Sequence, residues 1–123
     1  MEIQRPTRYP LHGRAQVALP NQRVLSGHAL DISLGGLCIQ LEDQIPPGVV
    51  YPIRFEMVIQ GKTNVVMAQA KLVYCVFASH GGFRLGFAFT EEDPKRTTLI
   101  KSLAGKNMIA GAASKETGAK ADS

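Results

Sequence analysis

The chain has few of the features that mark membrane-spanning, disulfide-stapled or metal-binding proteins. Its longest apolar run, Leu72 to Ala78, has seven residues, whereas a membrane helix needs roughly 20. It has two cysteines, Cys38 and Cys75, without a CxxC or a paired Cys/His spacing. We therefore expect no insertion into a membrane, no metal site, and two buried, unreactive thiols. Residues 1–25 contain arginines but no apolar signal segment, which predicts a cytoplasmic location.

Catalytic signatures are also missing. The sequence contains no HExxH, GxSxG, P-loop or GxGxxG pattern. Of its three histidines, His28 falls in a predicted strand and His80 in a predicted turn, where structural or solvated positions are usual. The acidic run at residues 91–93 precedes a predicted helix, where negative charge complements the helix dipole. We expect a protein that is not an enzyme and that needs no cofactor.

Composition and charge favour one globular domain with an anionic partner. The chain has 123 residues, of which 45% are hydrophobic and 20% charged, as in ordinary soluble domains. The net charge is +4 at pH 7, which mildly favours an anionic partner. Four arginines stand in the first 23 residues, and the planar guanidinium of arginine matches phosphate or stacks on a base.

A period-two alternation of apolar residues dominates the chain and predicts half-buried strands. Turn signals separate the alternating runs, and together they give about six short strands. This count predicts a mainly all-β fold, as a small antiparallel barrel or sandwich. The clearest runs are residues 14–19, 37–41, 53–59, 66–74 and 83–89. In 66–74, Leu72 and Tyr74 share the face predicted to be buried.

One helix is predicted near residues 93–104. Asp93 is a suitable N-cap, Pro94 a suitable first helical residue, and Gly105 a suitable stop. The domain organisation follows: a flexible, Arg-rich arm over 1–11, a barrel with its helix over 12–104, and a disordered tail over 105–123.

The segment Leu30-Asp31-Ile32-Ser33-Leu34-Gly35-Gly36 joins two predicted strands and has two readings. As a hairpin, its Asp and Ser side chains bond local backbone, and its glycines supply positive φ. As a polar pocket at the barrel rim, Asp31 accepts hydrogen bonds from a ligand, Ser33 donates or accepts, and Gly36 lets the ligand approach the backbone.

Together with Arg5-Pro6-Thr7-Arg8, this segment resembles the PilZ family of bacterial cyclic di-GMP receptors. That family has an RxxxR motif in an N-terminal loop and a [D/N]xSxxG motif on the following strands. Asp31, Ser33 and Gly36 complete the second motif, and residues 83–89 with the helix resemble the family's last strand and helix. The resemblance implies a six-stranded antiparallel barrel with a C-terminal helix. It also implies a cyclic di-GMP site at Arg5, Arg8, Asp31, Ser33 and Gly36.

The arginine motif reads QRxxR in this chain. If Arg8 is the second arginine, Gln4 stands at the first position and Arg5 is its neighbour. Either Arg5 reaches the same phosphate, or the site lacks one guanidinium. We expect the ligand to order residues 1–11 over the barrel rim and so move the arm relative to a partner.

Three functions stay open from the sequence. The first is a cyclic di-GMP receptor that signals through an unidentified effector protein. The second is a degenerate PilZ-like adaptor that binds no nucleotide and acts by protein–protein contact. The third is a barrel that binds a nucleic acid polymer, which we do not expect because the aromatic residues of 83–89 alternate inward instead of forming a stacking platform. The sequence leaves a homodimer open.

Overall fold

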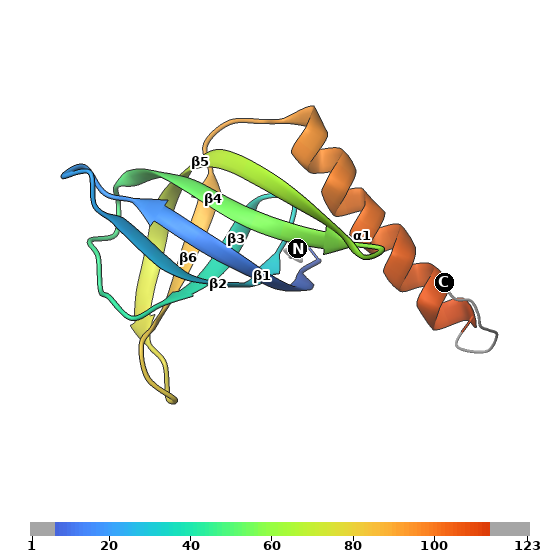
Figure 1. Ribbon diagram of the computed structural model, residues 1–123, viewed down its shortest axis with the longest axis horizontal. Helices are drawn as coiled ribbons and strands as arrows, with labels where there is room; N and C mark the ends of the chain where they lie inside the picture. Colours follow the sequence, from blue (N-terminus) through green and yellow to red (C-terminus); the bar gives the residue numbers. More distant parts are fainter. Residues whose placement is uncertain (1–6, 114–123) are drawn as a thin grey trace, which may run out of the picture.

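The computed structural model describes residues 7–113, and the side chains of residues 7–103. Six antiparallel strands close into a barrel in the order β1-β2-β3-β6-β5-β4, and a helix follows them (Figure 1). The elements are β1 (Tyr9–Ala18), β2 (Val24–Ile32), β3 (Gly36–Leu41), β4 (Val50–Ile59), β5 (Lys62–Phe77), β6 (Phe83–Phe89) and α1 (Pro94–Ala113). The predicted six-stranded antiparallel barrel with a C-terminal helix is confirmed.

The barrel interior is filled by the residues that the alternation placed inward. In β4, Ile53, Phe55 and Met57 are buried while their neighbours on the strand are more exposed. Each large apolar side chain that is fully buried contributes roughly 1.5–3 kcal/mol to folding. The largest completely buried side chains come from all six strands and the helix: Val17, Ile32, Leu37, Ile39, Leu41, Phe55, Met57, Leu72, Leu85 and Ile100.

Strand β5 is much longer than its neighbours and pairs with two of them along different stretches. It pairs with β4 from Lys62 to Lys71, and with β6 from Ala70 to Phe77. Its hairpin with β4 turns through Gln60 and Gly61, both with positive φ (53° and 78°), as in the two-residue turns that match the strand twist.

A β-bulge between Leu72 and Tyr74 corrects one prediction. The alternation placed Tyr74 on the buried face with Leu72, but the bulge shifts the register with β6, and Tyr74 lies 45% exposed on the outside. An extra residue in one strand reverses the side-chain alternation beyond it. Cys75 consequently turns toward the core and is half-buried, whereas Cys38 is buried as predicted; both thiols are free.

The predicted boundaries at both ends differ from the structure. Residues 9–11 belong to β1 and not to the arm, because Leu11 is buried in the core and a bulge between Pro10 and Gly13 accommodates the proline. The helix does not end at Gly105 but runs to Ala113, since one helical glycine costs only about 1 kcal/mol relative to alanine. The remainder of the predicted arm and tail, 1–6 and 114–123, lies outside the described residues.

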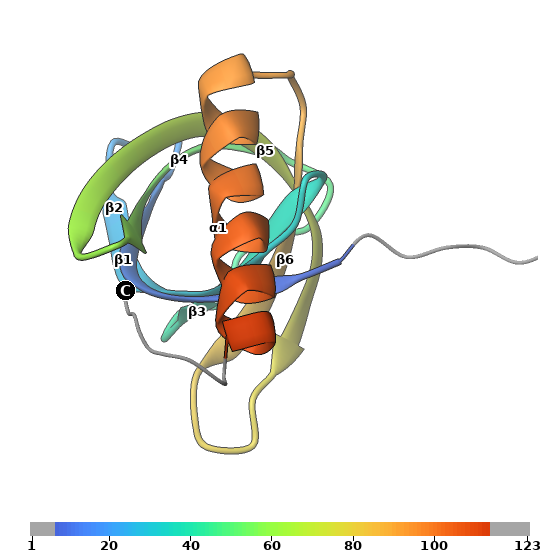
Figure 2. The same ribbon diagram turned by 90° about the vertical axis from the view of Figure 1, so that its right-hand side faces the viewer.

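Helix α1 lies across one end of the barrel (Figure 2). It begins as predicted, with the Asp93 carboxylate accepting hydrogen bonds from the backbone N–H groups of Lys95 and Arg96 at 3.0 and 3.5 Å. The Arg96 guanidinium lies over the Phe89 ring, 3.9 Å from Cζ to the centroid. Within residues 7–113, no helix is long and apolar enough to cross a membrane.

Because Ile100 is fully buried between helix and barrel, truncation to alanine removes contacts that hold α1 in place. We expect Ile100→Ala to lower the free energy of unfolding by about 2–5 kcal/mol, measured by urea denaturation. Lys101→Ala, at the exposed next position, is the matched control and should change it little. Equal effects of the two substitutions would show that the helix is not docked.

Candidate functional site

Arg8 and Asp31, 23 residues apart in the chain, form an ion pair on the outer face of the barrel. Arg8 Nε donates to Asp31 Oδ1 at 2.6 Å, and both side chains are partly exposed (47% and 34%). The register explains the contact, since Arg8 just precedes β1 and Pro10 pairs with Asp31 of β2. Only one nitrogen of Arg8 and one oxygen of Asp31 are used within the described residues, so the pair retains hydrogen-bonding capacity.

The turn from β2 to β3 holds the other two predicted residues. The Ser33 N–H donates to the Gly36 carbonyl at 2.8 Å, and the Ser33 residue is only 2% exposed. The predicted positive φ of Gly35 and Gly36 is wrong. Glycine is needed at position 36 for a different reason, since a Cβ there would lie 2.2 Å from the Phe87 carbonyl oxygen. The glycine allows β3 to approach β6 closely.

Asp31 belongs to a row of residues that crosses five strands of the barrel wall. Successive pairings link Pro10 to Asp31, Asp31 to Cys38, Cys38 to Gly86, and Gly86 to Tyr74. Three strand spacings separate Asp31 from Tyr74, or about 14 Å. We call this row, together with Arg8, which contacts Asp31, the outer strip.

Tyr74 forms the far end of the outer strip as an exposed aromatic surface. A Cβ on Gly86 would lie 2.1 Å from Tyr74 Cε2, so the ring lies directly against the backbone of β6. The missing side chain at position 86 makes the space for the ring. An aromatic ring that is held on one side and partly exposed can accept a stacked base.

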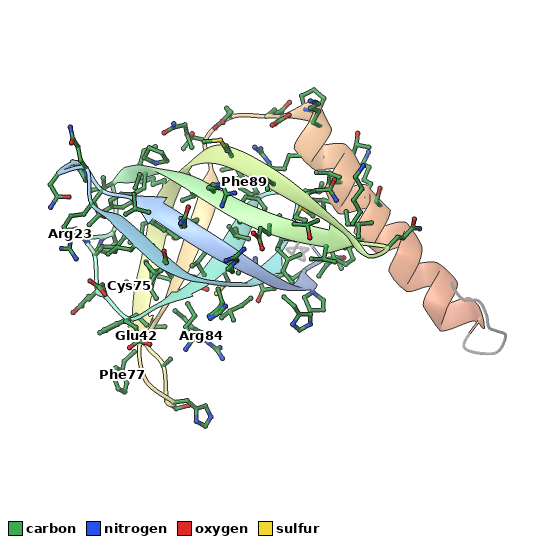
Figure 3. The ribbon with its side chains drawn as sticks, viewed as in Figure 1. Arg23, Glu42, Cys75, Phe77, Arg84 and Phe89 are labelled. Carbon is green, nitrogen blue, oxygen red and sulfur yellow. The ribbon has the colours of Figure 1, made fainter. Side chains whose placement is uncertain are left out.

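Arg84 adds positive charge beside the outer strip. It stands two residues before Gly86 on β6, pairs with Gln40 and Val76, and is exposed. Figure 3 shows its side chain pointing away from the barrel. Because Arg84 follows the same alternation as Gly86, it lies on the outer surface.

The thiol and the phenol of the outer strip both favour their protonated forms. Burial raises the pKa of Cys38, and the Asp31 carboxylate raises it further, against the lowering by the Tyr74 hydroxyl and by Arg8 and Arg84. Burial and the neighbouring Cys38 likewise raise the pKa of Tyr74. The Cys38 thiol is therefore neutral near pH 7 and is a poor nucleophile.

The structure brings together four of the five predicted site residues. Arg8 contacts Asp31, and Ser33 and Gly36 form the adjacent turn, whereas Arg5 lies outside the described residues. The sequence did not predict that Tyr74, Cys38 and Arg84 lie at this surface. The apolar run 72–77 gave no sign of the bulge that exposes Tyr74. No group of three His, Cys, Asp or Glu residues that could hold a metal ion occurs in the described part of the chain.

The comparison with sequence families gives one match. The family described as PilZ domain matches residues 2–105, which is most of the chain and includes every predicted site residue. No curated protein matches the chain.

Several solved structures share the fold. The Bacillus subtilis inhibitor of motility MotI/DgrA has a TM-score of 0.74 at 12% identity, over 88% of this chain and 53% of its own. YcgR from Escherichia coli in complex with c-di-GMP has a TM-score of 0.73 at 20% identity, over 89% and 47%. The PilZ domain of YcgR with c-di-GMP has a TM-score of 0.66 at 20% identity, over 94% and 100%. The chain thus spans about half the length of the first two proteins.

The raised pKa of Cys38 predicts a loss of stability at alkaline pH. A folded-state pKa above the ordinary value of 9.0 contributes stability that is present below pH 9 and is lost as pH rises through the folded value. The free energy of unfolding should therefore fall as the pH rises above 9, and Cys38→Ala should make that fall smaller. Urea denaturation across this range measures it, with Cys75→Ala as the control. An unchanged fall in Cys38→Ala would contradict the assignment.

Proposed function

Because the chain belongs to the PilZ domain family, we propose that it is a receptor for cyclic di-GMP that performs no catalysis and signals through a partner protein. The ligand lies on the outer strip and the adjacent turn between β2 and β3, and is held by Arg5, Arg8, Asp31, Ser33 and Gly36. The proposal includes a cytoplasmic location, where the protein would encounter a nucleotide messenger.

The ion pair of Arg8 with Asp31 is the observation that carries the proposal. A guanine presents two acceptors, O6 and N7, next to two donor groups, N1–H and N2–H₂. A guanidinium beside a carboxylate offers the complementary order, donors followed by acceptors. The atoms of Arg8 and Asp31 without partners in the described part of the chain can engage that edge. Hydrogen bonds that involve a charged group are the stronger ones, at about 1.5–3 kcal/mol each.

The remainder of the outer strip suits the second base and the phosphates. Tyr74 provides a ring held against Gly86, on which a purine can stack. Arg84 is exposed nearby and, with Arg5, supplies positive charge for the two phosphates. Within the turn, Gly35 is exposed to solvent, and a Cβ there would meet nothing within 4 Å. We therefore add Tyr74 and Arg84 to the proposed contacts.

The alternative is an adaptor that binds no nucleotide. Gln4 at the first arginine position of the motif favours it, since a missing guanidinium weakens phosphate binding. The titrations below distinguish the two proposals.

Isothermal titration with cyclic di-GMP tests the receptor proposal. We expect the parent protein to bind cyclic di-GMP in preference to GTP and cyclic GMP. Arg8→Ala should lower the affinity for cyclic di-GMP tenfold to a hundredfold, because it removes about one charged hydrogen bond. Asp31→Ala should weaken binding and reduce the selectivity for guanine.

Arg23→Ala is the matched control, because Arg23 is an exposed arginine paired with Asp43 at 3.7 Å, away from the outer strip. It should bind like the parent. If the parent shows no binding at high protein concentration, the adaptor proposal replaces the receptor. If Arg8→Ala and Asp31→Ala both bind like the parent, the site is elsewhere.

The stacking assignment has its own test. Tyr74→Ala should lower the affinity for cyclic di-GMP about tenfold, within the 1–3 kcal/mol of a base–aromatic stack, while Tyr74→Phe keeps most of it. Phe77→Ala is the control, since Phe77 is an exposed aromatic on the same strand that packs against Phe83 instead. Equal affinities of Tyr74→Ala and Phe77→Ala would remove Tyr74 from the site.

A further inference from the structure

The first half of β5 has a strand neighbour on one side only. Residues 62–69 pair with β4, but β6 ends at Phe89, which is opposite Ala70. Beyond this point, Thr90 and Glu91 cover only Gln69: Thr90 N–H donates to its carbonyl and the Glu91 carboxylate accepts from its N–H. The edge from Thr63 to Met67 is therefore open within the described residues.

The register identifies which backbone groups face this open edge. In a two-residue hairpin, the residues flanking the turn, Ile59 and Lys62, form a hydrogen-bonded pair, and bonded pairs then alternate. Asn64, Val66 and Ala68 therefore bond to β4. Gln69 pairs with Pro52. Because proline has no backbone N–H to donate, this pair agrees with its assignment as a non-hydrogen-bonded pair. The remaining residues, Thr63, Val65 and Met67, direct their N–H and C=O groups outward.

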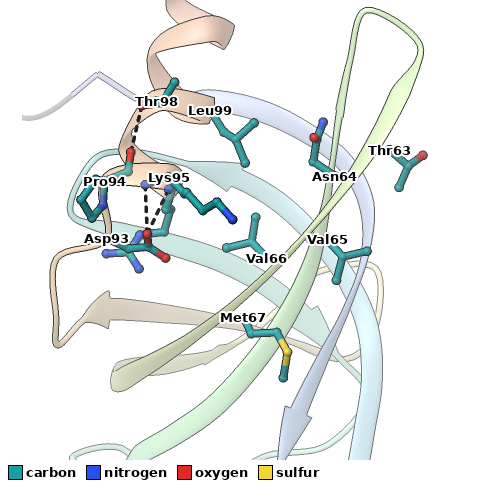
Figure 4. Close-up of a pocket in the computed structure, with 11 residues that line it drawn as sticks. Thr63, Asn64, Val65, Val66, Met67, Asp93, Pro94, Lys95, Thr98 and Leu99 are labelled. Carbon is teal, nitrogen blue, oxygen red and sulfur yellow. Dashed lines mark hydrogen bonds between the residues drawn. The ribbon is translucent and has the colours of Figure 1, made fainter.

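These three residues line a groove between β5 and the first turns of α1 (Figure 4). Its volume is about 650 Å³, and Leu99 contributes to the helix side. Val65 and Met67 are 50% and 70% exposed. An uncharged edge strand with exposed apolar side chains is a template for pairing with another chain.

The charges that line the groove favour an acidic occupant. The Asp93 carboxylate already accepts two N–H groups of the helix cap. Lys95 is exposed and has no ion-pair partner in the described part of the chain. Arg96 also lines the groove, and its Nη1 is buried without a hydrogen-bond partner among the described residues. A carboxylate in the groove would be attracted by both cations.

We propose that this groove docks an extended, acidic segment of a partner protein, which adds as a strand to the open edge of β5. Main-chain hydrogen bonds to Thr63, Val65 and Met67 provide affinity, and a carboxylate near Lys95 provides selectivity. A second copy of this chain fits less well, since it would bring another Lys95 into the same groove. The inference does not depend on cyclic di-GMP, and its tests are made without it.

Hydrogen exchange measures the open edge directly. The amide protons of Thr63, Val65 and Met67 should exchange at least tenfold faster than those of Asn64, Val66 and Ala68, which bond to β4. Equal protection of the two sets would mean that the edge is covered, and would overturn the proposal.

Selection of phage-displayed random heptapeptides against the chain tests the occupant. We expect peptides that alternate β-branched and polar residues and carry Asp or Glu, and that shift the amide resonances of Thr63, Val65 and Met67. Val65→Pro removes an outward N–H and no bond to β4, so it should weaken these peptides at least tenfold. Lys95→Glu should weaken them about fivefold. Lys101→Glu, an exposed lysine outside the groove, is the matched control and should not.

Sedimentation of the parent and of Val65→Pro examines the competing occupant. A monomeric parent supports the partner segment. A dimer that Val65→Pro dissociates would assign the edge to a second copy and would overturn the proposal. A selection that yields no peptide weakened by Val65→Pro or by Lys95→Glu would overturn it as well.

Discussion

The sharing of one long strand between two neighbours is the constraint on which the rest of the structure depends. Strand β5 pairs with β4 along its first part and with β6 along its second, and this closes the barrel. The bulge that lets its second half follow β6 also turns Tyr74 outward into the strip that contains Asp31. Its first half has an open edge because β6 has already ended. The candidate nucleotide site and the groove beside α1 are thus consequences of the same closure.

The fold could be read from the sequence because the alternation of apolar residues is a local property. Residues 53–59 and 83–89 show it plainly, and Asp93-Pro94 marks the start of the helix as the structure has it. The spacing of Asp31, Ser33 and Gly36 likewise belongs to one turn. Arg8 could be assigned only through the family resemblance, since its contact with Asp31 depends on the pairing of β1 with β2.

The missed features depend on neighbours that are distant in the chain. The run 72–77 is wholly apolar, so it contains no marker of the residue at which the alternation reverses. Gly36 is needed because of the Phe87 carbonyl, and Gly86 because of the Tyr74 ring. Each of these groups belongs to another strand, so no sequence pattern around the glycine indicates it. The continuation of α1 beyond Gly105 is a different case, because residues 105–113 have the composition from which a tail was predicted, yet they belong to the helix.

The contact of Arg8 with Asp31 has a consequence for ligands that offer only negative charge. An exposed pair of this kind is worth about 1 kcal/mol or less, so a ligand can separate it at little cost. A simple phosphate that attracts Arg8, however, comes to lie beside a carboxylate that has lost its counter-charge. Only a molecule that presents acceptors to the guanidinium and N–H groups to the carboxylate satisfies both residues at once. The pair therefore discriminates through the repulsion that it imposes on the wrong molecule.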